Sequence, residues 1–452
     1  MTGADFQDKV YAYLSRKPWF KTPCHILVAV SGGADSMALL HTLIHWSEIS
    51  VSAVHVHHGL RGETADRDEQ FVQQYCQKHN VSLISYHEDV YAFARDNGFS
   101  LEEAGRHLRY QRFEEARTLV GADWIATAHT ASDRAETTLM RILRGTGIDG
   151  LAGIPDCRGN ICRPLLSCTR QEVEAYCDAC HLPFVNDETN TDPAFTRNRI
   201  RHQILPMLKE INPSVEDALL RLSDHAAEDA DLLLTMAHEC LTDSKDSFGY
   251  RLDGFRNQAH PIQRRMIMLM MRDATVPSIE QTHIMAASQV LENGDGDVML
   301  PGGYVFSVSQ GIAAVHSASI VDVSAPVAID SLPMSGVFGG QRFRINLIEN
   351  AAENIHNLFS NTVVDYAKIE GNLHIRCRKE CDSIHPAGRG VGKSLKKLMN
   401  ECGIPAYLRD AYPIMCDSVG VVMIPGYAVD ERVKVTDDTN HLLVWESDDV
   451  TT

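Results

Sequence analysis

Residues 26–40 of the 452-residue chain read ILVAVSGGADSMALL, and the architecture of the N-terminal half follows from them. The first five residues are apolar and predict a buried strand, whereas the apolar spacing after residue 35 predicts a helix. A bend between a parallel strand and a helix binds anions, because free backbone N–H groups and the helix dipole favour negative charge there. The bend therefore predicts a phosphate-binding loop, formed by Ser31, Gly32, Gly33, Ala34, Asp35 and Ser36.

Each residue type in this bend suits a bound polyphosphate. Gly32 and Gly33 let the backbone approach a phosphate closely, and Ser31 and Ser36 add hydroxyl donors. Asp35 alone would repel phosphate, but a carboxylate here can hold Mg²⁺ that bridges phosphate oxygens. The simpler alternative is that Asp35 only caps a helix that follows a Gly-Gly turn.

The bend is not a Walker A loop, because the G-x4-G-K-[ST] pattern is absent from it. Residues 388–394, GRGVGKS, are similar to the end of that pattern, but Ala387 stands where its first glycine would be. We interpret residues 388–394 as a basic loop.

Up to residue 212 the chain alternates short apolar segments with amphipathic ones. This pattern predicts an α/β fold with a doubly wound, Rossmann-like parallel sheet that is covered on both faces. The expected strands are residues 25–30, 50–56, 82–87 and 124–129. The expected helices are residues 36–46, 64–79, 101–120 and 133–144.

The pattern changes twice further along the chain, which predicts three domains. After Pro213 it is helical and then shows short β-like runs up to about residue 320, so we expect a helical middle domain. The last part mixes short strands with one helix near residues 393–401, which predicts a small α+β C-terminal domain. The expected domains are residues 1–213, 214–330 and 331–452.

Composition excludes several classes of protein. Hydrophobic residues make up 44% of the chain and charged residues 23%, as in ordinary globular proteins. No apolar run is long enough for a transmembrane helix. The acidic, amphipathic N-terminus resembles no signal or transit peptide, so we expect a cytoplasmic location and no membrane partner. The net charge of −18 argues against a general nucleic-acid binder, so RNA contacts would need a local basic patch.

The cysteines predict neither a disulfide scaffold nor a metal site. Twelve cysteines in a chain of this length are too few for such a scaffold. Cys177 and Cys180 form a C-x-x-C pair, but no second pair lies at a spacing typical of zinc sites. We interpret the pair as two cysteines on one helix face.

Two segments at the ends of predicted strands carry candidate site residues. In VHVHHGLR, residues 54–61, His57 and Arg61 would lie beside a nucleotide at the carboxyl edge of the sheet. The histidines there also suggest zinc, although no cysteine or carboxylate is adjacent. In the segment after the fourth strand, Asp133 and Glu136 lie one helical turn apart and can share a cation or serve as base and ligand. The alternative is that these acids only stabilise the first turn of a helix.

Arginines recur in two short segments. Arg106, Arg109 and Arg112 follow helical spacing and face either phosphate or solvent. A second cluster suits contacts with polyphosphate or an RNA backbone. This cluster consists of Arg197, Arg199 and Arg201.

Taken together, the motifs resemble the tRNA(Ile)-lysidine synthetase family of N-type PP-loop ATP pyrophosphatases. They cover nearly all of residues 25–206 in the order of that family. The matching motifs are SGGADS, HHGLRGE, EEAGRHLRY, AHTASDRAET, LMRILRGTGIDGLAGI, RPLL, NDETN and TRNRIRH. Residues 373–414 and 421–432 are similar to the acceptor-stem-binding domain of the family.

The resemblance implies a ligase that forms a carbon–nitrogen bond. With ATP and Mg²⁺, the enzyme would adenylate C2 of the wobble cytidine, position 34, in isoleucine tRNA with a CAU anticodon. Free L-lysine would then displace AMP and give lysidine, which changes codon recognition from AUG to AUA. The middle domain would position the tRNA. The sequence leaves a homodimer open.

The resemblance also implies roles for individual residues. Asp35 and Asp133 would bind Mg²⁺, with Asp133 as the alternative general base on the lysine amine. Glu136 would bind that amine, and His129 matches a histidine of the family motif. Arg109 would stabilise charge on the leaving groups.

The chain departs from the family at one motif. The family commonly has Asp-Asp-Gln where this chain has Ser132-Asp133-Arg134. One carboxylate is therefore missing and one cation is added beside the expected Mg²⁺ site.

The C-terminal part contains the expected basic patch. Residues 373–410 carry eight Lys or Arg against four Asp or Glu, which gives this segment a net charge of +4. Tyr407 and Tyr412 would stack on exposed bases beside the patch. The alternative is an ordinary basic helix with two core tyrosines. The expected tRNA contacts, with the three lysines on one helix face, are Lys393, Lys396, Lys397 and Arg409.

Three other functions stay open at this point. A tRNA 2-thiolation enzyme would need catalytic cysteines, for which Cys177 and Cys180 are the candidates. Another PP-loop adenylating synthetase, one that uses ammonia, would not need a basic C-terminal module. A non-catalytic RNA-binding module would leave Asp35 and Asp133 without a role.

Overall fold

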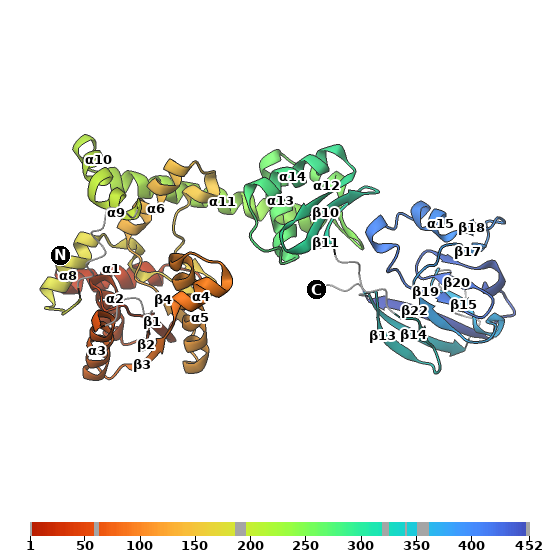
Figure 1. Cartoon of the computed structure of the whole chain (residues 1–452), viewed down its shortest axis with the longest axis horizontal. Coiled ribbons are helices and arrows are strands. Elements are labelled where there is room, and N and C mark those ends of the chain that lie inside the picture. Colours follow the sequence, from red (N-terminus) through yellow and green to blue (C-terminus); the bar gives the residue numbers. More distant parts are fainter. Residues whose placement is uncertain are drawn as a thin grey trace. The chain divides into compact units, whose positions relative to one another are not determined.

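The structure is a computed structural model that describes residues 2–57, 63–185, 196–318, 325–339, 341–349 and 361–448. The chain forms two compact units, Met1–Asp231 and Leu232–Thr452. Figure 1 shows their helices and strands, and each unit is described by itself below. Within the described residues, no helix is both long and apolar enough to cross a membrane.

A six-stranded sheet forms the centre of the first unit. Its strand order is β3-β2-β1-β4-β6-β5, and all neighbours are parallel except β5 and β6. The strands are β1 (Cys24–Ala29), β2 (Ile49–His57), β3 (Ser82–His87), β4 (Trp124–Ala126), β5 (Cys157–Arg158) and β6 (Ile161–Cys162). The first four were predicted from the sequence. The strand order reverses beside β1, and ligands of such sheets bind at the carboxyl ends of the strands at this point.

Helices cover both faces of the sheet, as predicted. Side chains alternate along β1, so Ile26 and Val28 pack on one face and Leu27 on the other. The first face is covered by α1 (Gly3–Ser15), α2 (Ala34–Ile44), α3 (Glu63–Lys78) and α8 (Arg170–Ala179). The second face is covered by α5 (Leu101–Val120), against which α4 (Val90–Asn97) packs.

A second group of helices in this unit packs around α6 (Ala131–Arg144). Thr130 caps α6 and exchanges hydrogen bonds with Asp133, which forms a capping box. Apolar side chains of α6, among them Ala135 and Leu139, pack with the helices that follow in the chain. The remaining helices of this group are α7 (Ile148–Leu151), η1 (Pro164–Ser167), α9 (Thr196–Arg199), η3 (Ile200–Ile204), α10 (Leu205–Ile211) and α11 (Val215–Asp243).

Arg134 joins α6 to the long helix α11. Its Nε donates to Ser223 Oγ at 3.0 Å and its Nη1 to Asp224 Oδ1 at 2.6 Å. Ser223 is fully buried and donates in turn to the carbonyl oxygen of Ala152 at 2.8 Å. The backbone of Gly153 passes directly against this junction with a φ of +69°. Arg134, the basic residue that departs from the family pattern, therefore has structural partners on α11.

The middle part of the chain contains a sheet as well as the predicted helices. The helices are α12 (Leu252–Arg256), α13 (His260–Asp273) and α14 (Gln281–Asn293). They pack through buried residues such as Met270 and Phe306 on a five-stranded antiparallel sheet. Its strands are β7 (Lys245–Asp246), β8 (Gly249–Arg251), β9 (Gly296–Leu300), β10 (Tyr304–Ser309) and β11 (Ile312–Ser317). The description of this domain as helical was incomplete, because β7 and β8 follow α11 directly and complete the sheet.

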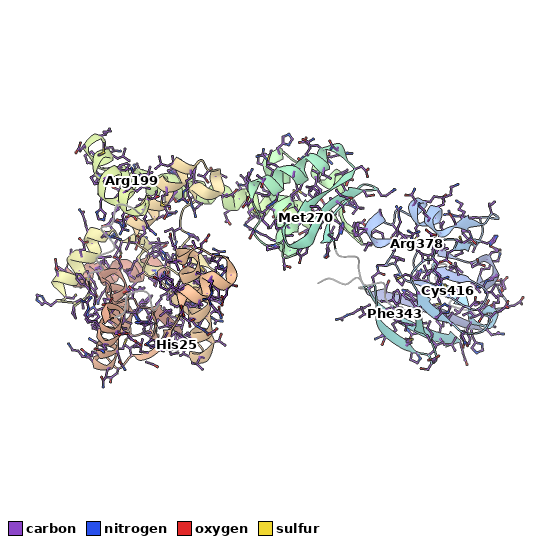
Figure 2. All side chains as sticks on the ribbon, in the orientation of Figure 1. His25, Arg199, Met270, Phe343, Arg378 and Cys416 are labelled. Atoms are coloured by element: carbon purple, nitrogen blue, oxygen red, sulfur yellow. The ribbon has the colours of Figure 1, made fainter. Side chains whose placement is uncertain are left out.

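Two larger sheets and a two-stranded one, β17-β18, build the described C-terminal part. A four-stranded sheet has the order β13-β14-β22-β15, and a five-stranded sheet has the order β12-β16-β19-β20-β21. Phe343 stacks on Trp445 at 5.0 Å in the core, and Figure 2 labels Phe343 and Cys416 among the side chains of this region. The elements are β12 (Val327–Ala328), β13 (Met334–Phe338), β14 (Gln341–Glu349), β15 (Val363–Asp365), β16 (His374–Arg376), β17 (Ser383–Ile384), β18 (Lys393–Ser394), α15 (Leu395–Glu401), β19 (Ile414–Cys416), β20 (Val421–Ile424), β21 (Ala428–Val429) and β22 (His441–Asp448). The short helical turns of this part are η6 (Tyr366–Lys368), η7 (Ala406–Leu408) and η8 (Glu431–Val433). A further turn, η4 (Pro301–Gly303), lies between β9 and β10 in the middle part of the chain.

The predicted domain boundary near residue 213 falls between α10 and α11, and the one near 330 follows β12. Because α11 runs continuously from Val215 to Asp243, it belongs to both compact units. The three-domain division stays a prediction.

Substitution of Gly153 by Ala tests the junction between α6 and α11. A Cβ atom there would lie 2.7 Å from Ser223 Oγ, and the φ of +69° is unfavourable for alanine. We expect Gly153→Ala to lower the free energy of unfolding by about 1–3 kcal/mol, measured by chemical denaturation. Gly147→Ala is the control, because its φ is −84° and a Cβ there meets nothing within 4 Å. Equal stability of the two variants would contradict the close packing at Gly153.

Candidate active site at the carboxyl edge of the parallel sheet

The loop between β1 and α2 is fixed by its own serines. Ser36 Oγ donates to the carbonyl oxygen of Gly33 at 2.9 Å and accepts from the backbone N–H of Ser31 at 3.2 Å. No side chain caps α2, whose N-cap is Gly33. The first N–H groups of the helix therefore lack an acceptor from such a cap and can serve a bound anion.

Gly32 is the residue of the loop whose backbone requires glycine. Its φ is +91°, in the region that side-chain-bearing residues rarely adopt. Its carbonyl oxygen accepts from the backbone N–H of Val185 at 2.9 Å, so the loop is also tied to the segment after α8. The loop thus has the glycine-dependent backbone conformation and the uncapped helix N–H groups that a phosphate-binding loop needs.

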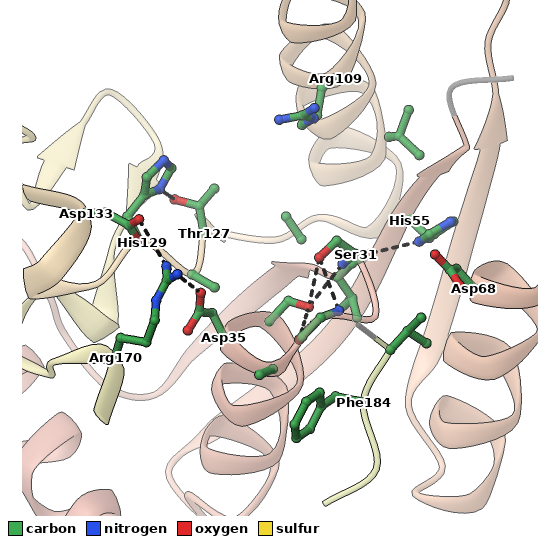
Figure 3. Close-up of a pocket in the computed structure, with 18 of the residues that line it drawn as sticks. Ser31, Asp35, His55, Asp68, Arg109, Thr127, His129, Asp133, Arg170 and Phe184 are labelled. Carbon is green, nitrogen blue, oxygen red and sulfur yellow. Dashed lines mark hydrogen bonds and ion pairs between the residues drawn. The ribbon is translucent and has the colours of Figure 1, made fainter. Parts of the chain in front are cut away.

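A cavity of about 980 Å³ opens over this loop and extends across the ends of β1, β2 and β4. Its volume lies at the upper end of the usual range for small-molecule sites. Figure 3 shows Ser31 and Asp35 at its floor, with Arg109 projecting from a helix on the opposite side. The cavity brings together most of the predicted catalytic and nucleotide-binding residues.

Asp133 and Glu136 lie on the first turns of α6 and are almost completely buried, with exposed fractions of 8% and 2%. Arg197 Nη2 and Arg201 Nη2 lie 3.1 and 3.2 Å from Asp133 Oδ1. Arg201 Nε donates to Glu136 Oε1 at 2.6 Å, and Arg197 Nε donates to Glu136 Oε2 at 3.0 Å. Two arginines that we predicted as tRNA contacts therefore neutralise these acids, whereas Arg199 is exposed.

The environment of Asp133 keeps its carboxylate charged. Burial raises its pKa, but Arg197, the backbone N–H of Thr130 and Arg170 together outweigh burial, so the pKa lies below its usual value. Thr130 N donates to Asp133 Oδ2 at 2.9 Å. A carboxylate with a lowered pKa is a weak base. Asp133 is thus better suited to hold a cation than to remove a proton.

Asp35 differs from Asp133 in its environment. Burial, together with the nearby charge of Asp133, raises the pKa of Asp35 to about 6, although Arg170 opposes this effect. Arg170 Nη2 lies 3.5 Å from Asp35 Oδ2 and 3.5 Å from Asp133 Oδ1. Figure 3 shows the Arg170 guanidinium between the two carboxylates. Sequence reasoning missed Arg170, whose only signal was its position just after the RPLL motif.

His129 lies at the end of the β4 segment and lines the cavity. Its Nδ1 is 3.1 Å from Thr127 Oγ1. Burial lowers the pKa of His129 to about 4, and nearby arginines add to this effect although Asp133 opposes it. The imidazole is therefore neutral at neutral pH and can accept a hydrogen bond from a substrate.

The arginines of α5 do not all face the cavity. Arg106 and Arg109 line it, and both are exposed to solvent. Arg112 instead pairs with Glu88 and with Glu115, the latter at 2.5 Å. The predicted stripe of three arginines thus contributes two cations to the site.

The end of β2 forms the far side of the cavity. His57 lines it there, and His57 Nε2 lies 3.1 Å from Asp66 Oδ1. His55 is buried and its Nδ1 lies 2.8 Å from the carbonyl oxygen of Val30, which orients its ring. Arg61, which we predicted beside the nucleotide, lies outside the described residues, as does His58.

The donor set of the cavity suits Mg²⁺ better than zinc. Among the residues that the structure describes, no three His, Cys, Asp or Glu side chains gather as a metal site would require. Mg²⁺ needs only one or two protein carboxylates when substrate phosphates and water complete its octahedron. Asp35 and Asp133, which both lie 3.5 Å from Arg170 Nη2, are the two carboxylates that could hold it.

The first cysteine of the C-x-x-C pair is inaccessible to a substrate in the cavity. Cys177 is buried, and its Sγ lies 3.7 Å from the carbonyl oxygen of Ala34. Burial, together with the nearby charge of Asp35, raises the pKa of the Cys177 thiol to about 12. Such a thiol carries almost no thiolate at neutral pH, so Cys177 is a weak nucleophile.

The predicted basic surface of the C-terminal part is smaller than expected. Lys396 and Lys397 are exposed on α15, but Lys393 lies on β18 before the helix and pairs with Glu401 at 2.5 Å. Arg409 Nε donates to the carbonyl oxygen of Ile404 at 2.7 Å, so it helps to hold this region together.

The two tyrosines near Arg409 pack against other parts of the second unit. Tyr412 is 8% exposed and donates to the carbonyl oxygen of Pro425. Tyr407 stacks on His316 with ring centroids 4.1 Å apart. The alternative of a core tyrosine is therefore correct for Tyr412, whereas Tyr407 is half-buried with its ring against His316.

Models of known protein families match the N-terminal and C-terminal parts of the chain. A family model described as PP-loop domain matches residues 4–208, and one described as TilS substrate C-terminal domain matches residues 373–445. These two matches contain the cavity and the basic surface of α15, respectively.

Several curated relatives align over almost their whole length. The tRNA(Ile)-lysidine synthase of Geobacillus kaustophilus is 31% identical, with 93% of this chain and 94% of the relative covered. That of Geobacter sulfurreducens is 30% identical, with 95% and 94% covered. That of Clostridium tetani is 29% identical, with 92% and 93% covered. The chain therefore belongs to the tRNA(Ile)-lysidine synthase family.

Proposed function

We propose that this enzyme ligates free L-lysine to C2 of the wobble cytidine in isoleucine tRNA with a CAU anticodon, at the expense of ATP. The observation that carries the proposal is the single cavity in which a phosphate loop adjoins two carboxylates and several arginines. Family membership over more than 90% of the chain supports the same reaction. A phosphate loop beside a cation site is what cleavage of a nucleotide requires.

The reaction has two steps with balanced products. The O2 oxygen of the cytidine attacks the α-phosphorus of ATP, the bond to the β-phosphate breaks, and pyrophosphate leaves. The ε-amine of lysine then attacks C2, loses a proton, and displaces AMP, which carries away the former O2 oxygen. The product is lysidine.

The loop Ser31–Ser36 would hold the phosphates through backbone N–H groups and serine hydroxyls. Mg²⁺, when bound by Asp35 and Asp133, supplies positive charge to the polyphosphate. Arg106 and Arg109 face the loop across the cavity and would stabilise the leaving groups. Both residues line the cavity and are exposed to solvent, where an entering substrate would meet them.

Glu136 takes a different role from the one the resemblance implied. Both of its oxygens bind arginine, at 2.6 Å to Arg201 and 3.0 Å to Arg197, and the side chain is 2% exposed. It is therefore a positioning residue that orients the two guanidinium groups at the cavity wall. Arg197 and Arg201 would act on the nucleotide or the modified base instead of the outer tRNA backbone.

His129 would accept a hydrogen bond from the incoming amine. Its lowered pKa, about 4, keeps it neutral and prevents repulsion of the lysine ammonium group. The tRNA would also contact the exposed pair Lys396 and Lys397 through phosphate.

The alternatives lack support from the cavity or the comparisons. A tRNA 2-thiolation enzyme needs an activated thiol, and burial suppresses ionisation of Cys177. The TilS substrate C-terminal domain match argues against a synthetase that uses ammonia. A non-catalytic RNA-binding module would not need three arginines that neutralise buried acids beside a phosphate loop.

Transfer of labelled lysine tests the proposal directly. The chain is incubated with isoleucine tRNA, Mg²⁺-ATP and labelled L-lysine, and the label in tRNA is measured, with methionine tRNA as the control. We expect label in isoleucine tRNA only. Label in neither tRNA, or in both equally, would contradict the proposal.

Asp35→Asn removes the charge of one carboxylate with little change in size. We expect pyrophosphate release to fall by about 100-fold or more, because charge at the phosphates is then left unbalanced. Binding of tRNA, measured by filter retention, should stay at the wild-type level. Glu174→Gln, on the cavity wall, is the matched control. Wild-type pyrophosphate release by Asp35→Asn would remove Asp35 from the reaction.

Replacement of Lys396 and Lys397 by alanine tests the RNA contact of α15. The double variant should bind tRNA more weakly, and its plot of log K against log salt should flatten by about 1–2 units. Lys245→Ala, an exposed lysine on β7, serves as the control and should keep the wild-type slope. An unchanged slope for the double variant would show that α15 does not contact phosphate.

A further inference from the structure

Arg170 occupies a special position among the arginines of the cavity. It is the first residue of α8, and its Nη2 is equidistant, at 3.5 Å, from Asp35 Oδ2 and Asp133 Oδ1. These distances are long for direct hydrogen bonds between charged groups, which usually lie near 2.8 Å. Arg170 therefore balances the charge of both carboxylates without binding tightly to either.

The hydrogen-bonding capacity of this guanidinium is only partly used. Arg170 Nε is buried and has no hydrogen-bond partner among the described residues. The neighbouring arginines differ, because Arg197 Nε and Arg201 Nε each donate to Glu136, at 3.0 and 2.6 Å. A buried donor that lacks a partner is costly and points to an acceptor that arrives with a ligand.

The backbone of Arg170 is held more closely than its side chain. Its N–H donates to Ser132 Oγ at 3.2 Å, and Thr169 caps the helix through a capping box with Glu172. Ser132 is the residue that stands where the family commonly has aspartate. The serine thus holds the start of α8 beside Asp133 and adds no negative charge of its own.

A guanidinium and a divalent cation cannot both lie between these two carboxylates, because their like charges repel at short distance. The phosphates of the nucleotide would bring the acceptors that Arg170 lacks, and the planar fork of arginine matches phosphate oxygens. Arg170 and the phosphate loop line the same cavity. The Arg170 side chain can therefore turn from the two carboxylates to phosphates bound at the loop.

We propose that Arg170 is a counter-ion of Asp35 and Asp133 in the nucleotide-free enzyme, and that it exchanges these carboxylates for nucleotide phosphate when a divalent cation binds. The inference rests on the proposed function, since it assigns a further phosphate-binding residue to the same site. Arg170 thus competes with the metal for the carboxylates before ATP binds, and binds the phosphates of ATP afterwards.

The test measures metal binding and nucleotide binding separately. Mn²⁺ affinity of the nucleotide-free chain is titrated by electron paramagnetic resonance, and Mg²⁺-dependent affinity for α,β-methylene-ATP is measured by calorimetry. For Arg170→Ala we expect Mn²⁺ to bind about 5-fold or more tightly than to wild type. The nucleotide analogue should bind about 10-fold or more weakly, because a charged hydrogen bond is lost.

Two further variants separate this role from a structural one. Arg170→Lys keeps the charge but lacks the planar fork, so Mn²⁺ affinity should stay near wild type while the analogue binds more weakly. Arg112→Ala, whose side chain pairs with Glu88 and Glu115 away from the cavity, should change neither affinity. A merely structural role would make both affinities of Arg170→Ala fall together.

Unchanged or weakened Mn²⁺ binding in a folded Arg170→Ala variant would overturn the inference. Folding is checked by the unfolding transition of the same preparation. Because neither measurement uses tRNA, lysine or turnover, a failure of lysine transfer would overturn the proposed function and leave these results interpretable.

Discussion

Three buried or half-buried carboxylates beside one phosphate loop set the central electrostatic constraint of this enzyme. Asp35, Asp133 and Glu136 would repel one another and any polyphosphate unless cations stood close to them. Three arginines from two segments meet this need, and all three approach the same oxygen of Asp133, at 3.1, 3.2 and 3.5 Å. These arginines are Arg170, Arg197 and Arg201. The acids and arginines of the cavity thus form a cluster in which positive and negative charges balance. A cation or a phosphate that enters the cavity changes the net charge of this cluster.

Helix α6 connects this cluster to the rest of the first unit. Asp133 and Glu136 carry its charges to the cavity, whereas Ala135 and Leu139 on another face pack in a hydrophobic core with α10 and α11. Arg134, on the same helix, binds the buried Ser223 of α11. Helix α6 therefore carries the two acids, an apolar face and Arg134. A movement of α11 that displaces α6 would also move the carboxylates. The departure from the family motif at Ser132 and Arg134 therefore has structural consequences on both sides of Asp133.

Much of the fold could be predicted because local patterns dictate it. The strands from His25 to Tyr86 and the helix after Gly33 follow from apolar runs and from a bend that only glycine adopts readily. The short strands β6, β7 and β8 contain two or three residues each, too few for any periodicity, so they form through their neighbours in the sheet. In the site, the loop and acids were predictable from their motifs. The partners of Arg197 and Arg170 were not, because tertiary packing alone determines whether an arginine meets a carboxylate or solvent. The burial of Tyr412 was missed for the same reason.

The central claim is that the balanced cluster beside the loop directs cleavage between the α- and β-phosphates of ATP. The most direct measurement identifies the spent nucleotide after turnover with α-labelled ATP, isoleucine tRNA and lysine. The account predicts labelled AMP, formed in equal amount to lysidine and to pyrophosphate. Labelled ADP would contradict it, since cleavage would then have occurred at the γ-phosphate.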